Sequence, residues 1–181
     1  MMNSHAHPAR GIEHVGMSVP DLADAERFFI DAFDASVLYR LIPRDNPKAR
    51  QDGADMSAVN GLDPKADVVG LSMMRLGQGP NIELFEIEGM RSRTPAEVMD
   101  MGLTHFSLLV EDINAVGRAM EKAGGTMLEG PREFFAQEAG EGNCMWFGRT
   151  PWGTLIELVQ LPVAPDYDEV ATQQRWLPQS R

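Results

Sequence analysis

The chain contains two stretches in which hydrophobic residues alternate with small or polar ones. The first covers residues 12–19 and the second covers residues 103–110. The hydrophobic positions are Val15, Met17 and Val19 in the first stretch, and Phe106, Leu108 and Val110 in the second. Because a period of two is typical of a β-strand with one packed face, both stretches predict strands.

A helical pattern follows each of these strands. Asp21 and Asp112 are residues suited to cap the first turn of a helix. Apolar residues then recur at helical spacing: Leu22, Ala25, Phe29 and Phe33 after the first cap, and Ile113, Val116, Met120 and Ala123 after the second. Later strands are predicted at residues 68–76, 82–88, 143–149 and 154–161. Each half of the chain therefore predicts a strand, a helix and further strands.

The two halves are also similar residue by residue. GIEH at residues 11–14 aligns with GLTH at 102–105, and RLGQGPNIEL at 75–84 aligns with RTPWGTLIEL at 149–158. We therefore expect a tail, two modules joined by a linker, and a second tail, with a longer loop inside the first module that is rich in Pro, Asp, Asn and Gly. The boundaries are 1–10 for a flexible N-terminal tail, 11–88 for the first module with its insertion loop at 43–65, 89–102 for the linker, 103–161 for the second module and 162–181 for the C-terminal tail.

Charge and cysteine content exclude several classes of partner. The chain of 181 residues has 16 Lys and Arg against 27 Asp and Glu, and a formal net charge of −11. This balance argues against nucleic acid or an anionic membrane surface, because both require a basic patch. The single cysteine, Cys144, cannot form a disulfide within the chain, and no apolar run approaches the ~20 residues of a spanning helix. We expect a cytoplasmic protein without membrane or nucleic-acid partners.

Two histidines and two glutamates occupy equivalent positions of the repeat. His14 and His105 lie in the first strand of each half, and Glu83 and Glu157 lie in the last. A glutamate inside an apolar strand needs a partner, and here it recurs together with a histidine. Two imidazoles and two carboxylates favour a divalent transition-metal ion with open positions for water or substrate.

With the motifs IEHVGMSV, NIELFEIE, LTHFSLLV and GTLIELVQLP, residues 11–161 resemble the vicinal oxygen chelate superfamily. This superfamily includes glyoxalase I, methylmalonyl-CoA epimerase, extradiol dioxygenases and bleomycin resistance proteins. The resemblance implies an α+β, glyoxalase-like fold in which two tandem βαβββ modules form an eight-stranded, cup-shaped sheet. It also implies one divalent metal ion (Ni, Co, Zn, Mn or Fe) at the bottom of the cup, bound by His14, Glu83, His105 and Glu157.

Within the superfamily, a full set of four ligands favours a metal-dependent lyase or isomerase, including the epimerases. Glyoxalase I typically grips the glutathione carboxylate with an arginine where this chain has Ser18, and it has an asparagine where this chain has Ile87. Glutathione specificity is therefore not expected, and lactoylglutathione lyase is an alternative. An Fe(II) ring-cleaving dioxygenase and a metal-free small-molecule binding or resistance protein are further alternatives. The stretch PWGTLIELVQLP is more similar to a glyoxalase-like branch that includes an epimerase of a cyclic keto-polyol.

The resemblance also implies roles for individual residues. The metal would stabilise an enediolate of a small oxygenated substrate while Glu157 acts as the base and Glu83 serves the opposite face. Substrate contacts are expected from residues on the inner face of the cup: Ser18, Ser107, Phe85, Met74 and Trp146. We expect a homodimer. Three questions stay open, namely whether one chain or two chains form the site, whether the loop at 43–65 is a lid, and which glutamate is the base.

Overall fold

The computed structural model describes residues 11–91, 94–167, 171 and 173–178. The expected N-terminal tail at 1–10 lies outside the described residues. The first module contains β1 (His14–Val19), α1 (Leu22–Phe33), β2 (Ser36–Ile42), β3 (Gln51–Asp52), α2 (Gly53–Asn60), β4 (Asp67–Arg75) and β5 (Asn81–Glu88). The second contains β6 (His105–Leu109), α3 (Ile113–Lys122), β7 (Thr126–Met127), β8 (Arg132–Glu133), β9 (Cys144–Arg149) and β10 (Leu155–Gln160).

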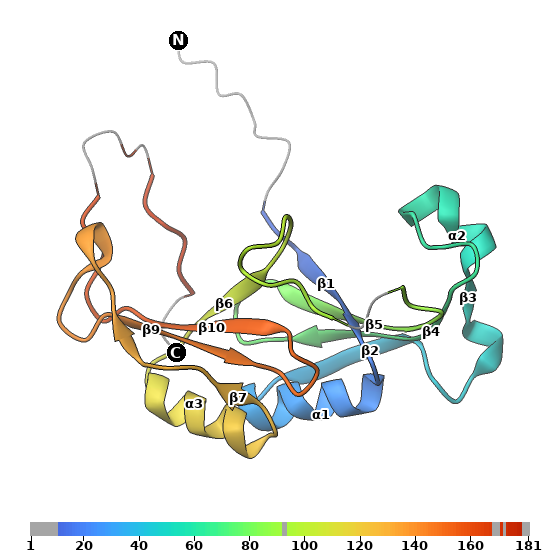
Figure 1. Ribbon diagram of the computed structural model, residues 1–181, viewed down its shortest axis with the longest axis horizontal. Helices are drawn as coiled ribbons and strands as arrows, with labels where there is room; N and C mark the ends of the chain where they lie inside the picture. Colours follow the sequence, from blue (N-terminus) through green and yellow to red (C-terminus); the bar gives the residue numbers. More distant parts are fainter. Residues whose placement is uncertain (1–10, 92–93, 168–170, 172, 179–181) are drawn as a thin grey trace, which may run out of the picture.

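The two modules have the same strand order (Figure 1). In the first, the order is β1-β5-β4-β2, with the short β3 also paired to β4; in the second it is β6-β10-β9-β7, with β8 also paired to β9. The first and last strands of each module run parallel, and the other neighbours are antiparallel. This order confirms two βαβββ modules. Within the described residues, each module forms its own five-stranded sheet, and no strand pairing joins the two sheets.

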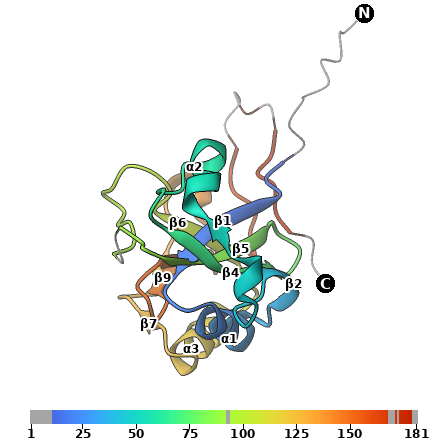
Figure 2. The same ribbon diagram turned by 90° about the vertical axis from the view of Figure 1, so that its right-hand side faces the viewer.

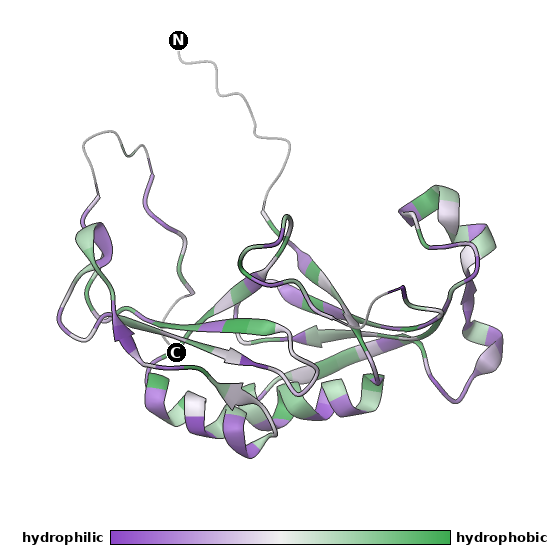
Figure 3. Cartoon of the chain, viewed as in Figure 1, coloured by the Kyte–Doolittle hydropathy of each residue, from purple (hydrophilic) through white to green (hydrophobic). Residues whose placement is uncertain are grey.

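Capping residues start both main helices where the sequence predicts. The Asp21 side chain accepts a hydrogen bond from the backbone N–H of Asp24, and Asp112 accepts one from Ala115. These bonds satisfy N–H groups that have no partner within the helix. Hydrophobic and hydrophilic positions then alternate along α1 and α3, which turns one face of each helix towards the sheets (Figure 3).

The modules are joined through their helices. α1 and α3 lie side by side on the same side of both sheets (Figures 1 and 2). One hydrophobic core combines residues of both modules, among them Phe29 and Leu84 from the first and Met120 and Leu158 from the second. Phe28 on α1 also contacts Trp152, which precedes β10, with their ring centroids 5.5 Å apart. Burial of this shared apolar surface holds the two halves together.

The insertion in the first module is folded. It contains a short 3₁₀ turn, β3 and α2, and it extends from the far end of the first sheet (Figure 1). Leu62 and Ala49 from this segment pack with Ile42 and Leu71 on the side of the sheet opposite α1. The insertion therefore covers part of that side. None of the helices in the described ranges is long and apolar enough to cross a membrane.

Candidate metal site

Strand alternation turns the four predicted ligands away from the helices. We call the side of each sheet opposite α1 and α3 its open face. Met17 and Val19 pack in the core from β1, so His14, an even number of positions from Gly16 and Ser18, belongs to the open face. Glu83 lies between two buried core residues of β5, and His105 and Glu157 hold the equivalent positions of β6 and β10.

In the first module, His14 and Glu83 form a pair. The Nε2 atom of His14 lies 3.5 Å from Oε2 of Glu83, and 41% of the His14 side chain is exposed. The other ring nitrogen, Nδ1, forms a 2.5 Å hydrogen bond with the Glu13 carboxylate, which also accepts one from Asn81. The hydrogen bond to Glu13 raises the pKa of His14; burial partly opposes this, and the nearby charge of Glu83 adds a smaller upward effect.

In the second module, His105 and Glu157 form the equivalent pair. The Nε2 atom of His105 lies 3.7 Å from Oε2 of Glu157, and 32% of the His105 side chain is exposed. Its Nδ1 atom lies 3.1 Å from the Thr104 hydroxyl. The hydroxyl of Ser107 donates a hydrogen bond to Oε2 of Glu157. The Phe147 ring stands edge-on to the His105 imidazole, with centroids 5.3 Å apart.

Each pair has the chemistry of half a metal site. An imidazole Nε2 and a carboxylate oxygen face each other, and the second imidazole nitrogen has an outer partner, as metal-binding histidines usually do. The structure does not bring the two pairs together: in the described part of the chain, no three His, Cys, Asp or Glu side chains are grouped so that they could hold one ion. One chain therefore presents two half-sites with two candidate ligands each.

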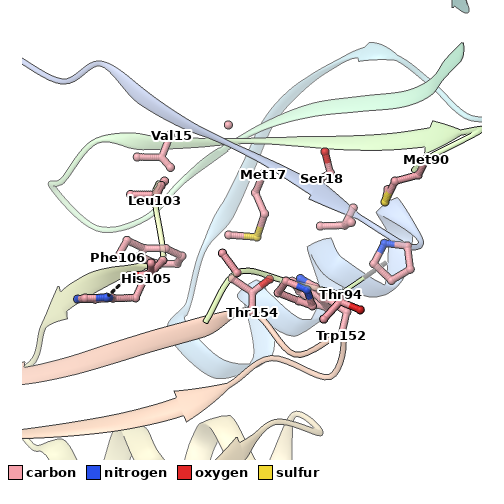
Figure 4. A pocket seen from close by; sticks show the side chains of 16 residues that line it. Val15, Met17, Ser18, Met90, Thr94, Leu103, His105, Phe106, Trp152 and Thr154 are labelled. Carbon is pink, nitrogen blue, oxygen red and sulfur yellow. Dashed lines mark hydrogen bonds between the residues drawn. The ribbon is translucent and has the colours of Figure 1, made fainter. Parts of the chain in front are cut away.

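A cavity of about 440 Å³ lies between β1, β6 and the linker (Figure 4). Its walls are mostly apolar and include Met17, Met90, Phe106 and Trp152. Of the four candidate ligands, only His105 lines this cavity. Ser18 of β1, an expected substrate contact, also lines the cavity. The cavity thus lies between the two modules, and His105 is its one contact with the half-sites.

Two expected substrate contacts lie on the helix side of their sheets. Met74 is buried in the shared core. The Trp146 indole packs against Gly117 of α3, where an added Cβ would come within 2.6 Å of the ring, and its Nε1 donates a hydrogen bond to the Leu128 carbonyl. Gly70, two strand positions before Ser72, is small because Leu22 of α1 approaches it closely. Gly70 and Gly117 therefore leave room for the helices to pack on the sheets, and they do not line the open faces.

The other expected contacts belong to the open faces. Ser18 is exposed, and Phe85 packs with Leu71 beside the insertion. The sequence did not single out Met73 and Phe147, which are the antiparallel register partners of Glu83 and Glu157. Their signal is the register itself, because side chains directly opposite each other share a face. Because neighbouring residues of a strand lie on opposite faces, the expectation that Trp146 lies on the open face assigns Phe147 to the helix side.

Comparison with known proteins agrees with the fold. Residues 13–142 match the model of the Glyoxalase/Bleomycin resistance protein/Dioxygenase superfamily, and the chain belongs to this family. A curated relative, a 2-epi-5-epi-valiolone epimerase from an Actinomyces species, is 29% identical over 164 residues, which cover 89% of this chain and 85% of the relative.

Solved structures with the same fold have lower sequence identity. A glyoxalase family protein from Bacillus cereus has a TM-score of 0.65 and 21% identity, covering 86% of this chain and 97% of that one. A glyoxylase/bleomycin resistance protein/dioxygenase domain from Frankia sp. has a TM-score of 0.58 and 18% identity, covering 84% and 98%. At this identity, the likeness concerns the fold.

Proposed function

We propose that this protein is a divalent-metal-dependent epimerase of a small, oxygen-rich substrate that has an acidic C–H next to a carbonyl group. The observation that carries the proposal is the recurrence of the same His–Glu pair on the open face of both modules. The curated relative named 2-epi-5-epi-valiolone epimerase supports the reaction type and the substrate class. We place the reaction in the cytoplasm.

The donor set fits one divalent ion held by His14, Glu83, His105 and Glu157. When bound, such an ion polarises a substrate carbonyl and lowers the pKa of the neighbouring C–H. The hydrogen bonds that His14 Nδ1 donates to Glu13 and that Ser107 donates to Glu157 would orient the ligands towards it.

We propose that two copies of the chain build each site. A protein-bound transition-metal ion usually has three or four protein ligands, and each half-site offers two. The first half-site of one protomer and the second half-site of its partner would supply all four. Because a two-fold axis relates the two protomers, the dimer would contain two such sites.

Exposed apolar residues beside both half-sites support this dimer. Ile12, two residues before His14, is 72% exposed, and Leu103, two residues before His105, is 66% exposed. Met99 and Met101 of the linker are also exposed. β1 and β6 are edge strands of their sheets, so a second copy can approach them directly. An exposed apolar patch beside two incomplete sites fits an interface between copies.

The chemistry of the chain's own residues is proton transfer. A carboxylate oxygen of Glu83 or Glu157 takes the proton from the substrate carbon, and the electron pair of the broken C–H bond moves onto the carbonyl. A solvent proton added to the other face of the carbon gives the epimer. The half-buried glutamates are suited to this role because each lies beside apolar residues that limit access of water.

The test uses the named substrate of the relative. The protein is stripped with a chelator, loaded with Ni, Co, Zn, Mn or Fe(II), and incubated with 2-epi-5-epi-valiolone in D₂O. We expect NMR to show metal-dependent loss of one C–H signal and formation of a deuterated epimer. Exchange with none of the five ions would overturn the proposal. Methylglyoxal–glutathione hemithioacetal and catechol with an oxygen electrode test the lyase and dioxygenase alternatives on the same samples.

A further inference from the structure

The two glutamates of the candidate site have different surroundings. In the parallel register, Glu157 lies opposite Ser107, whereas Glu83 lies opposite Gly16. The Ser107 hydroxyl donates a hydrogen bond to Glu157. At Gly16 there is no side chain to do the same for Glu83. The two half-sites therefore differ at the position of the parallel neighbouring strand that lies opposite each carboxylate.

The remaining contacts extend this difference. In the described part of the chain, the polar contact of the Glu83 carboxylate is the His14 imidazole at 3.5 Å, and Glu83 accepts no hydrogen bond there. The restraint in the first half-site falls on the histidine, whose Nδ1 atom is held by Glu13. In the second half-site, the glutamate itself is held.

A hydrogen bond from a hydroxyl changes what a carboxylate can do. The bond occupies a lone pair, fixes the orientation of the group and stabilises its negative charge. A carboxylate restrained in this way is a better fixed ligand and a less mobile base. Outer hydrogen bonds of this kind typically change metal affinity by about 10- to 100-fold.

We propose that Ser107 is a positioning residue that fixes Glu157 as a stationary metal-binding carboxylate, and that Glu83 is the carboxylate that takes the proton from the substrate. This inference rests on the proposed function and deepens it. The broken C–H bond gives its proton to a Glu83 oxygen and its electron pair to the substrate carbonyl, and solvent supplies the proton that returns. The resemblance alone had favoured Glu157 as the base.

The chain offers a matched pair of variants. Ser107→Ala removes the hydroxyl beside Glu157, and Gly16→Ser adds one at the equivalent position beside Glu83. The added side chain has room, because a Cβ at Gly16 would lie 3.4 Å from its nearest neighbour, the Phe85 ring. Ser107→Thr keeps the hydroxyl and tests rescue. Ser18→Ala removes an exposed hydroxyl of the same face of β1, which lies opposite Phe85 and not opposite a glutamate.

Metal affinity is measured first, by titrating Co²⁺ into the metal-free dimer and following calorimetry and the visible Co²⁺ spectrum. We expect Ser107→Ala to weaken Co²⁺ binding about tenfold. Ser107→Thr should restore it to within roughly threefold, and Ser18→Ala and Gly16→Ser should not weaken it. Thermal unfolding of each metal-free variant checks that the fold is retained.

Proton transfer is measured next, as deuterium exchange of 2-epi-5-epi-valiolone at saturating Co²⁺. We expect Gly16→Ser to slow exchange roughly fivefold, the effect of one hydrogen bond on a mobile base. Wild-type Co²⁺ affinity in Ser107→Ala overturns the inference, and so does a larger loss of exchange in Ser107→Ala than in Gly16→Ser. Failure of the wild type to bind any ion would overturn the proposed function itself, which keeps the two outcomes distinct.

Discussion

The carboxylate of Glu86 on β5 accepts a hydrogen bond from the backbone N–H of Leu22, the first residue of α1, at 3.0 Å. Gln160 on β10 does the same in the second module, where its side-chain oxygen accepts from the N–H of Ile113 at 2.9 Å. In both modules the last strand thus fixes the start of the helix. This bond ties α1 to the strand that also carries Glu83.

Loss of this cap should destabilise the protein. Glu86 is buried, and its second oxygen lies 2.5 Å from Nη1 of Arg44. We expect Glu86→Ala to lower the free energy of unfolding by about 2 kcal/mol, because the Leu22 N–H loses its side-chain acceptor and Arg44 loses one of its two carboxylate partners, keeping Asp21. Glu86→Gln, which copies Gln160, should lose less than half of that in urea unfolding. Equal losses would show that the Arg44 contact dominates.

The Co²⁺ affinity of ligand variants should show whether one chain or two chains form each site. His105→Ala and Glu157→Ala should each weaken binding at least about tenfold. A double variant of His14 and Glu83 and a double variant of His105 and Glu157 should each fail to bind Co²⁺ with wild-type affinity. Unfolded and refolded together, they should regain tight binding at one ion per mixed dimer, because one of its two sites combines both intact half-sites.

The control for this mixing is either double variant refolded alone. If the wild type binds Co²⁺ tightly but the refolded mixture does not, all four ligands of a site belong to one chain. Native mass spectrometry of the mixture reports the fraction of mixed dimers and the ions in each.

The packing of Trp146 on α3 predicts a strong effect at a remote glycine. A Cβ at Gly117 would lie 2.6 Å from the indole, which is also held by its hydrogen bond to Leu128. We expect Gly117→Ala to lower the free energy of unfolding by about 1–3 kcal/mol through overpacking. In the Trp146→Phe background the same change should cost much less, and a double-mutant cycle measures this coupling. Additive effects would contradict the contact.

The Cys144 thiol should react slowly. Burial, and to a lesser extent the charge of Glu133, raise the pKa of this thiol from its usual 9.0. Since only the thiolate reacts, less of it is present at any given pH, and alkylation by iodoacetamide should need more alkaline solution than in the unfolded chain. Glu133→Gln should speed the reaction slightly. A rate equal to that of the unfolded chain at pH 8 would contradict this environment.

The sequence predicted most of the local structure of this protein. Strand alternation and the capping residues Asp21 and Asp112 depend on neighbours close in the chain, so the elements predicted from them begin and end within two residues of the predicted positions. No positions were predicted for β2, α2 and the short strands β3, β7 and β8. The repeat also placed His14 and Glu83 on one face, because parallel pairing of the first and last strand follows from the module.

The sequence did not predict contacts that depend on how elements pack. Gly70 and Gly117 are small because Leu22 and Trp146 need the space, which a sequence pattern does not distinguish from an empty face. Met74 and Trp146 were therefore assigned to the wrong side of their sheets. The separation of the four candidate ligands into two pairs depends on how the two modules pack through α1 and α3, which no local pattern encodes.

Because the chain contains two copies of the module, the two halves of each proposed site can differ in sequence. If two identical single modules met on a two-fold axis, the axis would force both of their glutamates to be alike in every contact. Fusing two unequal modules into one chain removes that constraint, because each proposed site combines one first half with one second half. Gly16 and Ser107 can then differ without any loss of dimer symmetry. With both modules in one chain, the two candidate glutamate ligands, Glu83 and Glu157, can therefore have different roles.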